Sequence, residues 1–81
     1  NISPESKNDM EEIENLAAII SSMIKKRNSL GISQRELAAM CSVPQSSVAR
    51  IESFKTTPKL DTLLKLMHPL WLRLTVAAVA D

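Results

Sequence analysis

Apolar and small residues recur at helical spacing over residues 34–53. Within two short stretches, 34–41 and 45–53, they are separated by three, four or seven positions, so each stretch gathers them on one face of a helix. We expect the following side chains to point into the protein: Leu37, Ala38, Cys41, Val43, Val48 and Ile51. The pattern predicts two short amphipathic helices joined by a tight turn.

The outer face of the second predicted helix carries short or forked side chains that can contact base edges in the major groove of DNA. The residues on this face are Gln45, Ser46, Ser47, Ala49 and Arg50. In a helix-turn-helix the second helix enters the groove and the first crosses the DNA backbone. The two helices therefore predict a helix-turn-helix that binds double-stranded DNA.

A longer helical pattern precedes this motif. Asp9 is placed to cap it, Glu11 and Glu12 favour its first turn, and Gly31 supplies the left-handed residue that commonly ends a helix. The inward residues of this helix are predicted to be Ile13, Leu16, Ala17, Ile20 and Ile24. Residues 1–8 are polar and are expected to form a frayed arm.

Local signals set the other helix boundaries. Ser33 and Glu36 form a capping box at the start of the first short helix, and Pro44 stands at the start of the second, where a missing N–H costs little. A further helix is predicted over residues 60–68, ended by Pro69. Its inward residues are predicted to be Leu60, Leu63, Leu64 and Met67.

The tail, residues 72–81, has a different pattern. Leu72, Leu74 and Val76 alternate with polar residues, and this period of two favours a strand. A single strand leaves its backbone polar groups without partners, so we expect the tail to pair with the same segment of a second chain across a dimer axis. A final short helix is the competing interpretation, because three alanines near the end favour it.

Charge is unevenly distributed, although the net charge is only +1. Residues 1–14 carry five acidic side chains and one basic side chain, a charge of −4, whereas residues 15–81 carry nine basic and four acidic side chains, a charge of +5. A basic body behind an acidic leader is typical of a domain that touches phosphate groups on one face. Ordinary solvated charge is the alternative interpretation.

Composition argues against several other classes of protein. Two aromatic residues are too few to stack single-stranded nucleic acid. One cysteine and one histidine provide no disulfide framework and no metal cluster, and no serine–histidine or carboxylate pair indicates an enzyme. We expect no cofactor and find no sign of a small-molecule site. No apolar run reaches the ~18 residues of a membrane span, and no secretory signal is evident, so we expect a cytoplasmic protein.

Residues 24–74, about three fifths of the chain, resemble the Cro/CI-type (XRE) helix-turn-helix family of phage and bacterial regulators. The matching residues are Arg27, Gly31, Ser33, Gln34, Glu36, Leu37, Ala38, Val43, Gln45, Ser46, Ser47, Val48, Arg50, Ile51, Glu52, Lys55, Pro58 and Leu63. The resemblance implies an all-α, lambda-repressor-like bundle of four to five helices over residues 9–71. A C-terminal strand over residues 72–81 would pair across a dimer.

The resemblance also implies roles for individual residues. In that family, the positions that match Gln45, Ser46, Ser47 and Arg50 face the groove, and we add Ala49 as a contact for a thymine methyl group. We expect phosphate contacts from Gln34, Arg35, Lys55 and Lys59. Arg27 and Glu52 match a largely buried ion pair that ties the first helix to the recognition helix, so we assign them to structure rather than to DNA contact.

The sequence departs from the family at three positions where glycine is usual: Ser42, Phe54 and Trp71. Each side chain costs about 1 kcal/mol if the positive φ of the glycine is kept. Phe54 and Trp71 are interpreted either as core residues or as interface anchors, because aromatic residues are enriched at interfaces.

The long first helix and the strand-like tail are similar to the HigA- and HipB-like antitoxins within this family. These are small dimers that repress their own operon and sequester a toxin. The resemblance implies a homodimeric repressor with a palindromic operator and a toxin protein as a partner. The alternative is a protein-interaction module that neutralises a toxin, with DNA binding secondary, because the acidic first helix suits a basic partner.

Overall fold

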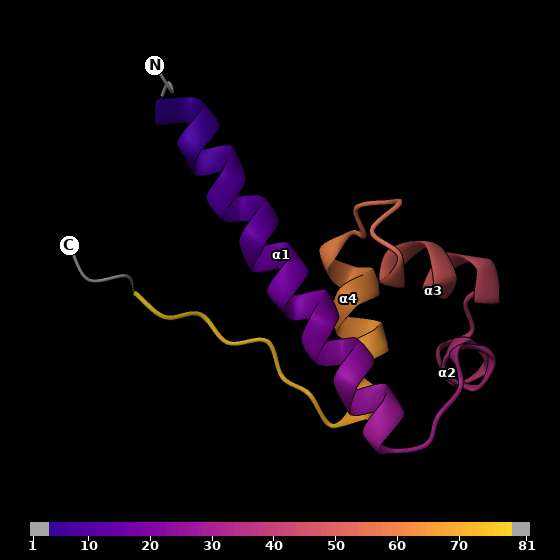
Figure 1. The fold of residues 1–81 in the computed structure, drawn as a ribbon. Coiled ribbons are helices and arrows are strands. Elements are labelled where there is room, and N and C mark those ends of the chain that lie inside the picture. The colour runs from indigo at the N-terminus through magenta and orange to yellow at the C-terminus, as the bar shows by residue number, and fades with distance from the viewer. Residues whose placement is uncertain (1–3, 79–81) are drawn as a thin grey trace.

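The computed structural model describes residues 4–78, and their side chains from residue 11 onward. The described part is all-helical, which confirms the predicted fold class (Figure 1). Its elements are α1 (Pro4–Ser29), α2 (Gln34–Cys41), α3 (Gln45–Glu52), α4 (Leu60–Met67) and the short 3-10 helix η1 (His68–Leu70). α2, α3 and α4 pack around the C-terminal half of α1, whereas the N-terminal half of α1 projects beyond them (Figure 1).

The first helix begins earlier than predicted. α1 starts at Pro4 rather than after a cap at Asp9, so the expected arm is wrong for residues 4–8, which are helical. Residues 1–3 of that arm lie outside the described residues. Proline is tolerated in the first turn because the N–H groups there have no partner within the helix.

The capping box that we predicted for α2 is present. The Glu36 backbone N–H donates to Ser33 Oγ at 3.0 Å, and the Ser33 backbone N–H donates to Glu36 Oε1 at 3.3 Å. Two of the N–H groups left unpaired at the start of the helix are thereby satisfied. This local signal fixes where α2 begins and hence how the helix-turn-helix is entered.

Four helix ends close with the same pair of backbone hydrogen bonds. In each, a residue with positive φ donates its N–H to the carbonyl three residues back, and the next residue donates to the carbonyl five residues back, which is a Schellman motif. The residues with positive φ are Gly31 (70°), Ser42 (56°), Phe54 (61°) and Trp71 (60°). Three of them are the positions where this sequence departs from glycine, so the backbone geometry is kept and its cost of about 1 kcal/mol each is incurred.

The core lies between the C-terminal half of α1 and the helices that follow. Its buried residues are Ile20, Met23, Leu37, Ala38, Cys41, Val48, Ile51, Leu63, Leu66, Met67 and Leu70. The inward residues predicted for α2 and α3 are among them, and Val43 in the turn packs against this cluster. The helical periodicity of residues 34–53 therefore identified the buried side of the motif correctly.

Two predicted core positions on α4 are wrong: Leu60 and Leu64 are exposed. The four leucines of this helix offer two overlapping helical stripes, and periodicity alone does not choose between them. Leu70 of η1 is fully buried and continues the stripe of Leu63, Leu66 and Met67 at offsets of three and four. α4 is therefore oriented with Leu63, Leu66 and Met67 facing the core, and Leu60 and Leu64 face solvent.

The N-terminal half of α1 also differs from the prediction. Ile13 is exposed, and Leu16 and Ala17 are only half-buried, although all three were expected to point inward. Full burial on α1 begins at Ile20. The periodicity is present, but the projecting half of the helix has little of the bundle beside it to cover its apolar face (Figure 1).

The described part of the tail, residues 72–78, is neither helix nor strand in the single chain, so the short-helix alternative is wrong there. Leu72 and Leu74 are half-buried against the core, whereas Arg73 and Thr75 are exposed, which preserves the predicted alternation. Val76 is 98% exposed. Pairing of this segment with a second chain stays a prediction.

Candidate nucleic-acid interface

α3 is anchored by its apolar face and presents its polar face to solvent. Val48 and Ile51 are buried in the core, while Gln45, Ser46 and Arg50 are exposed. Two further predicted contacts of α3, Ser47 and Ala49, are half-buried. This is the orientation that a recognition helix requires, although base contact by these residues stays a prediction.

Backbone geometry holds α3 in place at both ends. Pro44 precedes the helix with φ of −64°, and its carbonyl accepts the N–H of Ser47 at 3.0 Å. At the other end Phe54 donates to the Ile51 carbonyl at 3.1 Å, and Lys55 donates to the Arg50 carbonyl at 2.9 Å. The predicted phosphate contact Lys55 thus follows α3 through a fixed turn, with its side chain exposed.

A shallow hollow of about 390 Å³ lies beside α3, where the chain enters α4. It brings the predicted base contacts Ser47 and Arg50 together with the predicted phosphate contact Lys59. Thr56 and Thr62 also line it, and sequence reasoning missed both. The sequence feature that could have indicated them is a threonine within three residues of Lys59, but this pattern is too common to single out a site.

Arg27, Glu52 and Gln34 form one hydrogen-bonded network beneath this surface. Arg27 Nε donates to Glu52 Oε2 at 2.7 Å, and Arg27 Nη2 donates to Glu52 Oε1 at 2.8 Å. Arg27 Nη1 also donates to the backbone carbonyl of Ile32 at 2.8 Å, and Gln34 Nε2 donates to Glu52 Oε1 at 3.0 Å. The ion pair implied by the resemblance is therefore present, and Gln34 joins it.

The ion pair is largely removed from water. The side chains of Arg27 and Glu52 are 11% and 7% exposed. The hydrogen bond to Glu52 raises the pKa of Arg27 above its ordinary value, while burial acts in the opposite direction. Since that value is already far above neutrality, Arg27 is cationic at any pH at which the protein is studied. The pair thus links α1 to α3 as a fixed charge contact.

The remaining predicted phosphate contact, Arg35, lies on the exposed side of α2, next to the half-buried Gln34. Cys41, near the other end of α2, points into the core instead, and its Sγ donates to the Lys65 carbonyl at 3.3 Å. Burial raises the pKa of the Cys41 thiol, which disfavours the reactive thiolate at neutral pH. Cys41 therefore acts as a packing residue rather than as a nucleophile.

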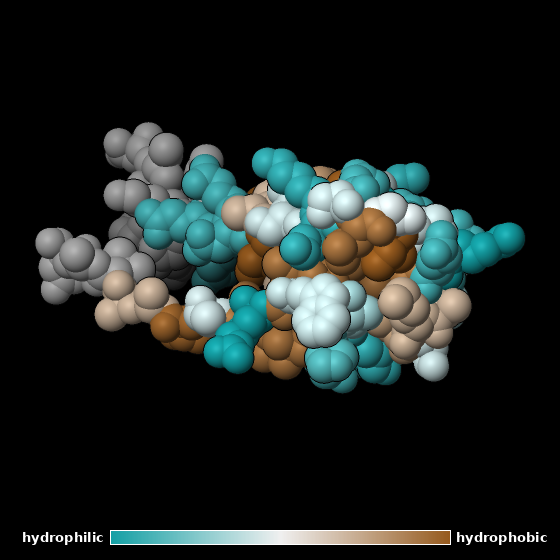
Figure 2. Space-filling view, turned by 90° about the horizontal axis from the view of Figure 1, so that it is seen from below, coloured by the Kyte–Doolittle hydropathy of each residue, from teal (hydrophilic) through white to brown (hydrophobic). Residues whose placement is uncertain are grey.

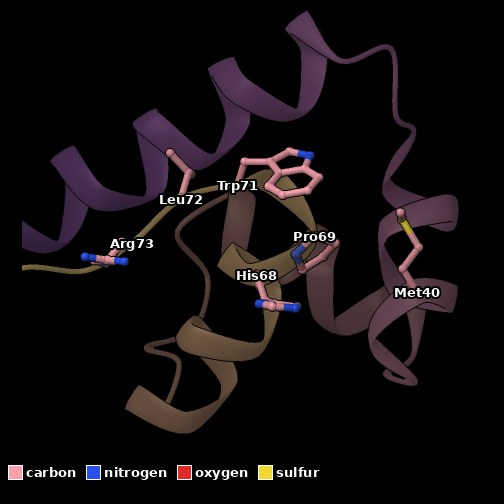
Figure 3. Close-up of a pocket in the computed structure, with 6 residues that line it drawn as sticks. All are labelled: Met40, His68, Pro69, Trp71, Leu72 and Arg73. Atoms are coloured by element: carbon pink, nitrogen blue, oxygen red, sulfur yellow. The ribbon is translucent and has the colours of Figure 1, made fainter.

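Phe54 and Trp71 are not core residues, because their side chains are 54% and 85% exposed. Trp71 lines a hollow of about 530 Å³ together with Met40 of α2 and Pro69 (Figure 3). Leu72 and Arg73, which follow along the chain, also line this hollow, and Leu72 points toward α1 (Figure 3). Viewed from below, the surface carries apolar side chains across its middle and hydrophilic side chains along its edges (Figure 2).

Among the side chains that the structure describes, those of residues 11–78, no three or more of histidine, cysteine, aspartate or glutamate are placed to hold a metal ion. Within residues 4–78, no helix combines the length and the apolar character needed to cross a membrane. What the described surface offers is a polar helix face flanked by basic side chains.

Known proteins share this helix-turn-helix. A family model described as helix-turn-helix matches residues 23–70, which is more than half of the chain. A protein of Haemophilus influenzae, named as an uncharacterized HTH-type transcriptional regulator, is 46% identical over 59 residues. The match covers 73% of this chain but only 60% of that relative. No solved structure matched the chain. The chain belongs to the XRE-type helix-turn-helix family.

Proposed function

We propose that this protein is a sequence-specific, homodimeric repressor that binds a palindromic operator through α3. The observation that carries the proposal is the orientation of α3, with Val48 and Ile51 buried while Gln45 and Arg50 are exposed. Family membership and the name of the Haemophilus influenzae relative support a role in transcription.

The outer face of α3 supplies the specificity. Gln45 pairs with an adenine edge and Arg50 with a guanine edge, each worth about 1–3 kcal/mol of discrimination against the wrong base. Ser46 and Ser47 allow close approach to the bases, and the methyl group of Ala49 suits a thymine methyl group. These residues read the sequence while others fix the position of the protein on the duplex.

Phosphate contacts come from residues around α3. Arg35, Lys55 and Lys59 are exposed basic side chains, and Gln34 is half-buried at the start of α2. Contacts to phosphates set the register and orientation without reading the sequence. Arg50, a proposed base contact, and Lys59, a proposed phosphate contact, line the same hollow. This supports the proposal that base contacts and phosphate contacts adjoin each other there.

The tail supports a dimer. Residues 73–78 make no backbone hydrogen bond with another described residue, and Val76 is almost fully exposed. An antiparallel copy of the same segment satisfies these backbone groups and covers Val76. We propose that Leu72 and Leu74 hold the tail against its own chain while its backbone edge pairs with the second chain.

Selection from a pool of randomised duplexes tests specific DNA binding. We expect a palindrome whose half-sites lie about one helical turn, ~34 Å, apart. Arg50→Ala should remove the preference at one base position, while Lys55→Ala should weaken all duplexes alike and reduce the salt slope by about one charge. A pool from which no sequence is enriched contradicts the proposal.

Light scattering of the purified chain tests the dimer. Val76→Lys should convert the dimer into a monomer, because the new charge would be buried against the second chain. Thr75→Lys is the matched control on the alternate face and should leave the dimer intact. A dimer that survives deletion of residues 72–81 contradicts pairing through the tail and moves the interface to Ile13 or Trp71.

A toxin partner is a second proposal, favoured by the acidic side of the projecting helix. Glu11, Glu12 and Glu14 are exposed on α1, ahead of the region that packs in the bundle. A basic toxin encoded beside this gene should co-purify with the chain in low salt and be released by Glu→Lys changes at these positions. Co-purification that is insensitive to those changes contradicts an acidic docking site.

A further inference from the structure

Glu52 accepts hydrogen bonds from two different side chains, one of which is a predicted phosphate contact. Arg27 of α1 makes two of these bonds, and Gln34 of α2 makes the third through Nε2 at 3.0 Å. Glu52 itself is the last residue of α3. The network therefore joins the recognition helix to the first residue of α2 by side chains as well as by the turn between them.

The carboxylate determines which way the Gln34 amide faces. An ionised carboxylate only accepts hydrogen bonds, so the NH₂ group of Gln34 rather than its oxygen must face Glu52. One of the two amide hydrogens is then used by Glu52. The other makes no hydrogen bond with another described residue, and Gln34 is only half-buried, so this hydrogen remains available to an oxygen outside the protein.

Arg27 allows a carboxylate to occupy this position. Glu52 alone would place a negative charge close to a proposed phosphate contact and would repel the DNA backbone. The bidentate bonds from Arg27 neutralise that charge, and the pair is largely buried. The carboxylate is thereby free to orient Gln34 without a net negative charge at the interface.

We propose that Glu52 and Arg27 are positioning residues for DNA binding, because they hold the Gln34 amide with its second hydrogen presented to the phosphate backbone. This inference rests on the proposed DNA binding through α2 and α3. A glutamine side chain loses considerable rotamer freedom when it is immobilised at an interface. In this protein the network fixes the Gln34 side chain before DNA binds, so less side-chain conformational entropy is lost on binding.

A double-mutant cycle on DNA affinity tests the positioning role. The paired variant Arg27→Met with Glu52→Leu replaces the ion pair by apolar side chains, a change that often preserves folding, and leaves the net charge unaltered. We expect this variant and Gln34→Ala each to bind the duplex selected by the wild type about tenfold more weakly. Because all three residues act through one contact, the triple variant should bind no more weakly than Gln34→Ala.

Other results overturn the inference. If the pair is only structural, the folded paired variant keeps the wild-type DNA affinity. Alternatively, it loses affinity independently, so that the fold-losses of the paired variant and of Gln34→Ala multiply in the triple variant. If the paired variant does not fold, Glu52→Asp takes its place, because it keeps a negative charge opposite Arg27 while the shorter side chain withdraws the acceptor from Gln34. Its loss of affinity must also vanish in the Gln34→Ala background. A wild-type chain that binds no duplex removes the proposed function as well, whereas uncoupled losses remove the positioning role alone.

Nuclear magnetic resonance of the protein without DNA gives an independent readout. The Gln34 side-chain amide proton that is bonded to Glu52 should exchange slowly with solvent in the wild type, and its chemical shift should differ from that of the corresponding proton in an exposed glutamine. In the paired variant its exchange rate and chemical shift should both approach those of an exposed glutamine. Exposed-like signals in the wild type would show that the amide is not held, whatever the DNA affinity.

Discussion

The bundle and the projecting segments of this protein differ in where their packing partners lie. In the bundle, the core residues of α2, α3 and α4 are buried by one another and by the C-terminal half of α1. In the projecting part, residues 11–15 of α1 are exposed, and residues 73–78 make no backbone hydrogen bond with a described residue. The bundle is thus satisfied within one chain, whereas the projecting part leaves apolar side chains and backbone groups exposed to solvent, where the proposed second molecule would cover them.

This contrast has a direct physical consequence. Changes in the bundle should alter the free energy of unfolding of a single chain, because the lost contacts lie within it. Changes at the exposed side chains of the projecting part, such as Ile13 and Val76, should alter association instead, since little of the single chain packs on them. The proposed DNA-binding surface belongs to the bundle, so its geometry is set within one chain. Binding to both halves of a palindrome would still require the proposed dimer.

The largest expected effect in the bundle comes from breaking the ion pair on one side. Arg27→Met leaves the carboxylate of Glu52 buried without its charge partner, and we expect the free energy of unfolding to fall by about 3–5 kcal/mol. Urea denaturation followed by circular dichroism measures it. The paired variant Arg27→Met with Glu52→Leu should lie within about 1 kcal/mol of the wild type, because no buried charge is left unpaired. If the two variants lost the same free energy of unfolding, an unpaired buried charge would not be the cause of the loss.

The same kind of truncation in the two regions compares them most directly. Leu37 is fully buried, so Leu37→Ala should reduce the free energy of unfolding by about 2–5 kcal/mol through lost burial and a residual cavity. Val76 is 98% exposed, and Val76→Ala should change the stability of the single chain by less than about 0.5 kcal/mol. The dissociation constant of the proposed dimer should rise instead, which sedimentation over a dilution series measures.

If Val76→Ala destabilised the isolated chain as strongly as Leu37→Ala, the tail would be part of the bundle. If it changed neither stability nor association, the tail would have no partner of the kind proposed. Either outcome would remove the distinction between the two regions. The order of the two effects therefore tests the comparison without requiring the operator sequence.

The features that the sequence predicted well are those with local causes. The capping box of Ser33 and Glu36 involves residues three positions apart, so the local sequence is enough to indicate it. The buried face of α3 followed from its period because only one apolar stripe was available. For the candidate site, the exposure of Gln45 and Arg50 is the complement of that stripe.

The features that the sequence did not predict depend on distant parts of the chain. The rotation of α4, which exposes Leu60 and Leu64, accompanies the burial of Leu70 in the element that follows. The bond from Gln34 to Glu52 joins residues eighteen positions apart, and no periodicity in either helix indicates it. Ile13 satisfies the helical pattern of α1, but the bundle does not extend far enough to bury it.

The smallest expected effect concerns the residue that ends the recognition helix. Phe54 has φ of 61° and a side chain that is 54% exposed, so Phe54→Gly should remove backbone strain at little cost in buried surface. We expect a gain of about 0.5–1 kcal/mol in the free energy of unfolding, measured by urea denaturation. Ser53→Gly is the matched control. Because Ser53 has φ of −92°, this variant should lose about 0.5 kcal/mol in the free energy of unfolding through the greater freedom of the unfolded chain.

A strained, exposed aromatic residue beside the proposed DNA-binding surface indicates a contact that compensates for the strain. Phe54→Gly should therefore bind its duplex or its partner more weakly while being more stable, and a variant that is more stable with both affinities unchanged would show that Phe54 makes no such contact.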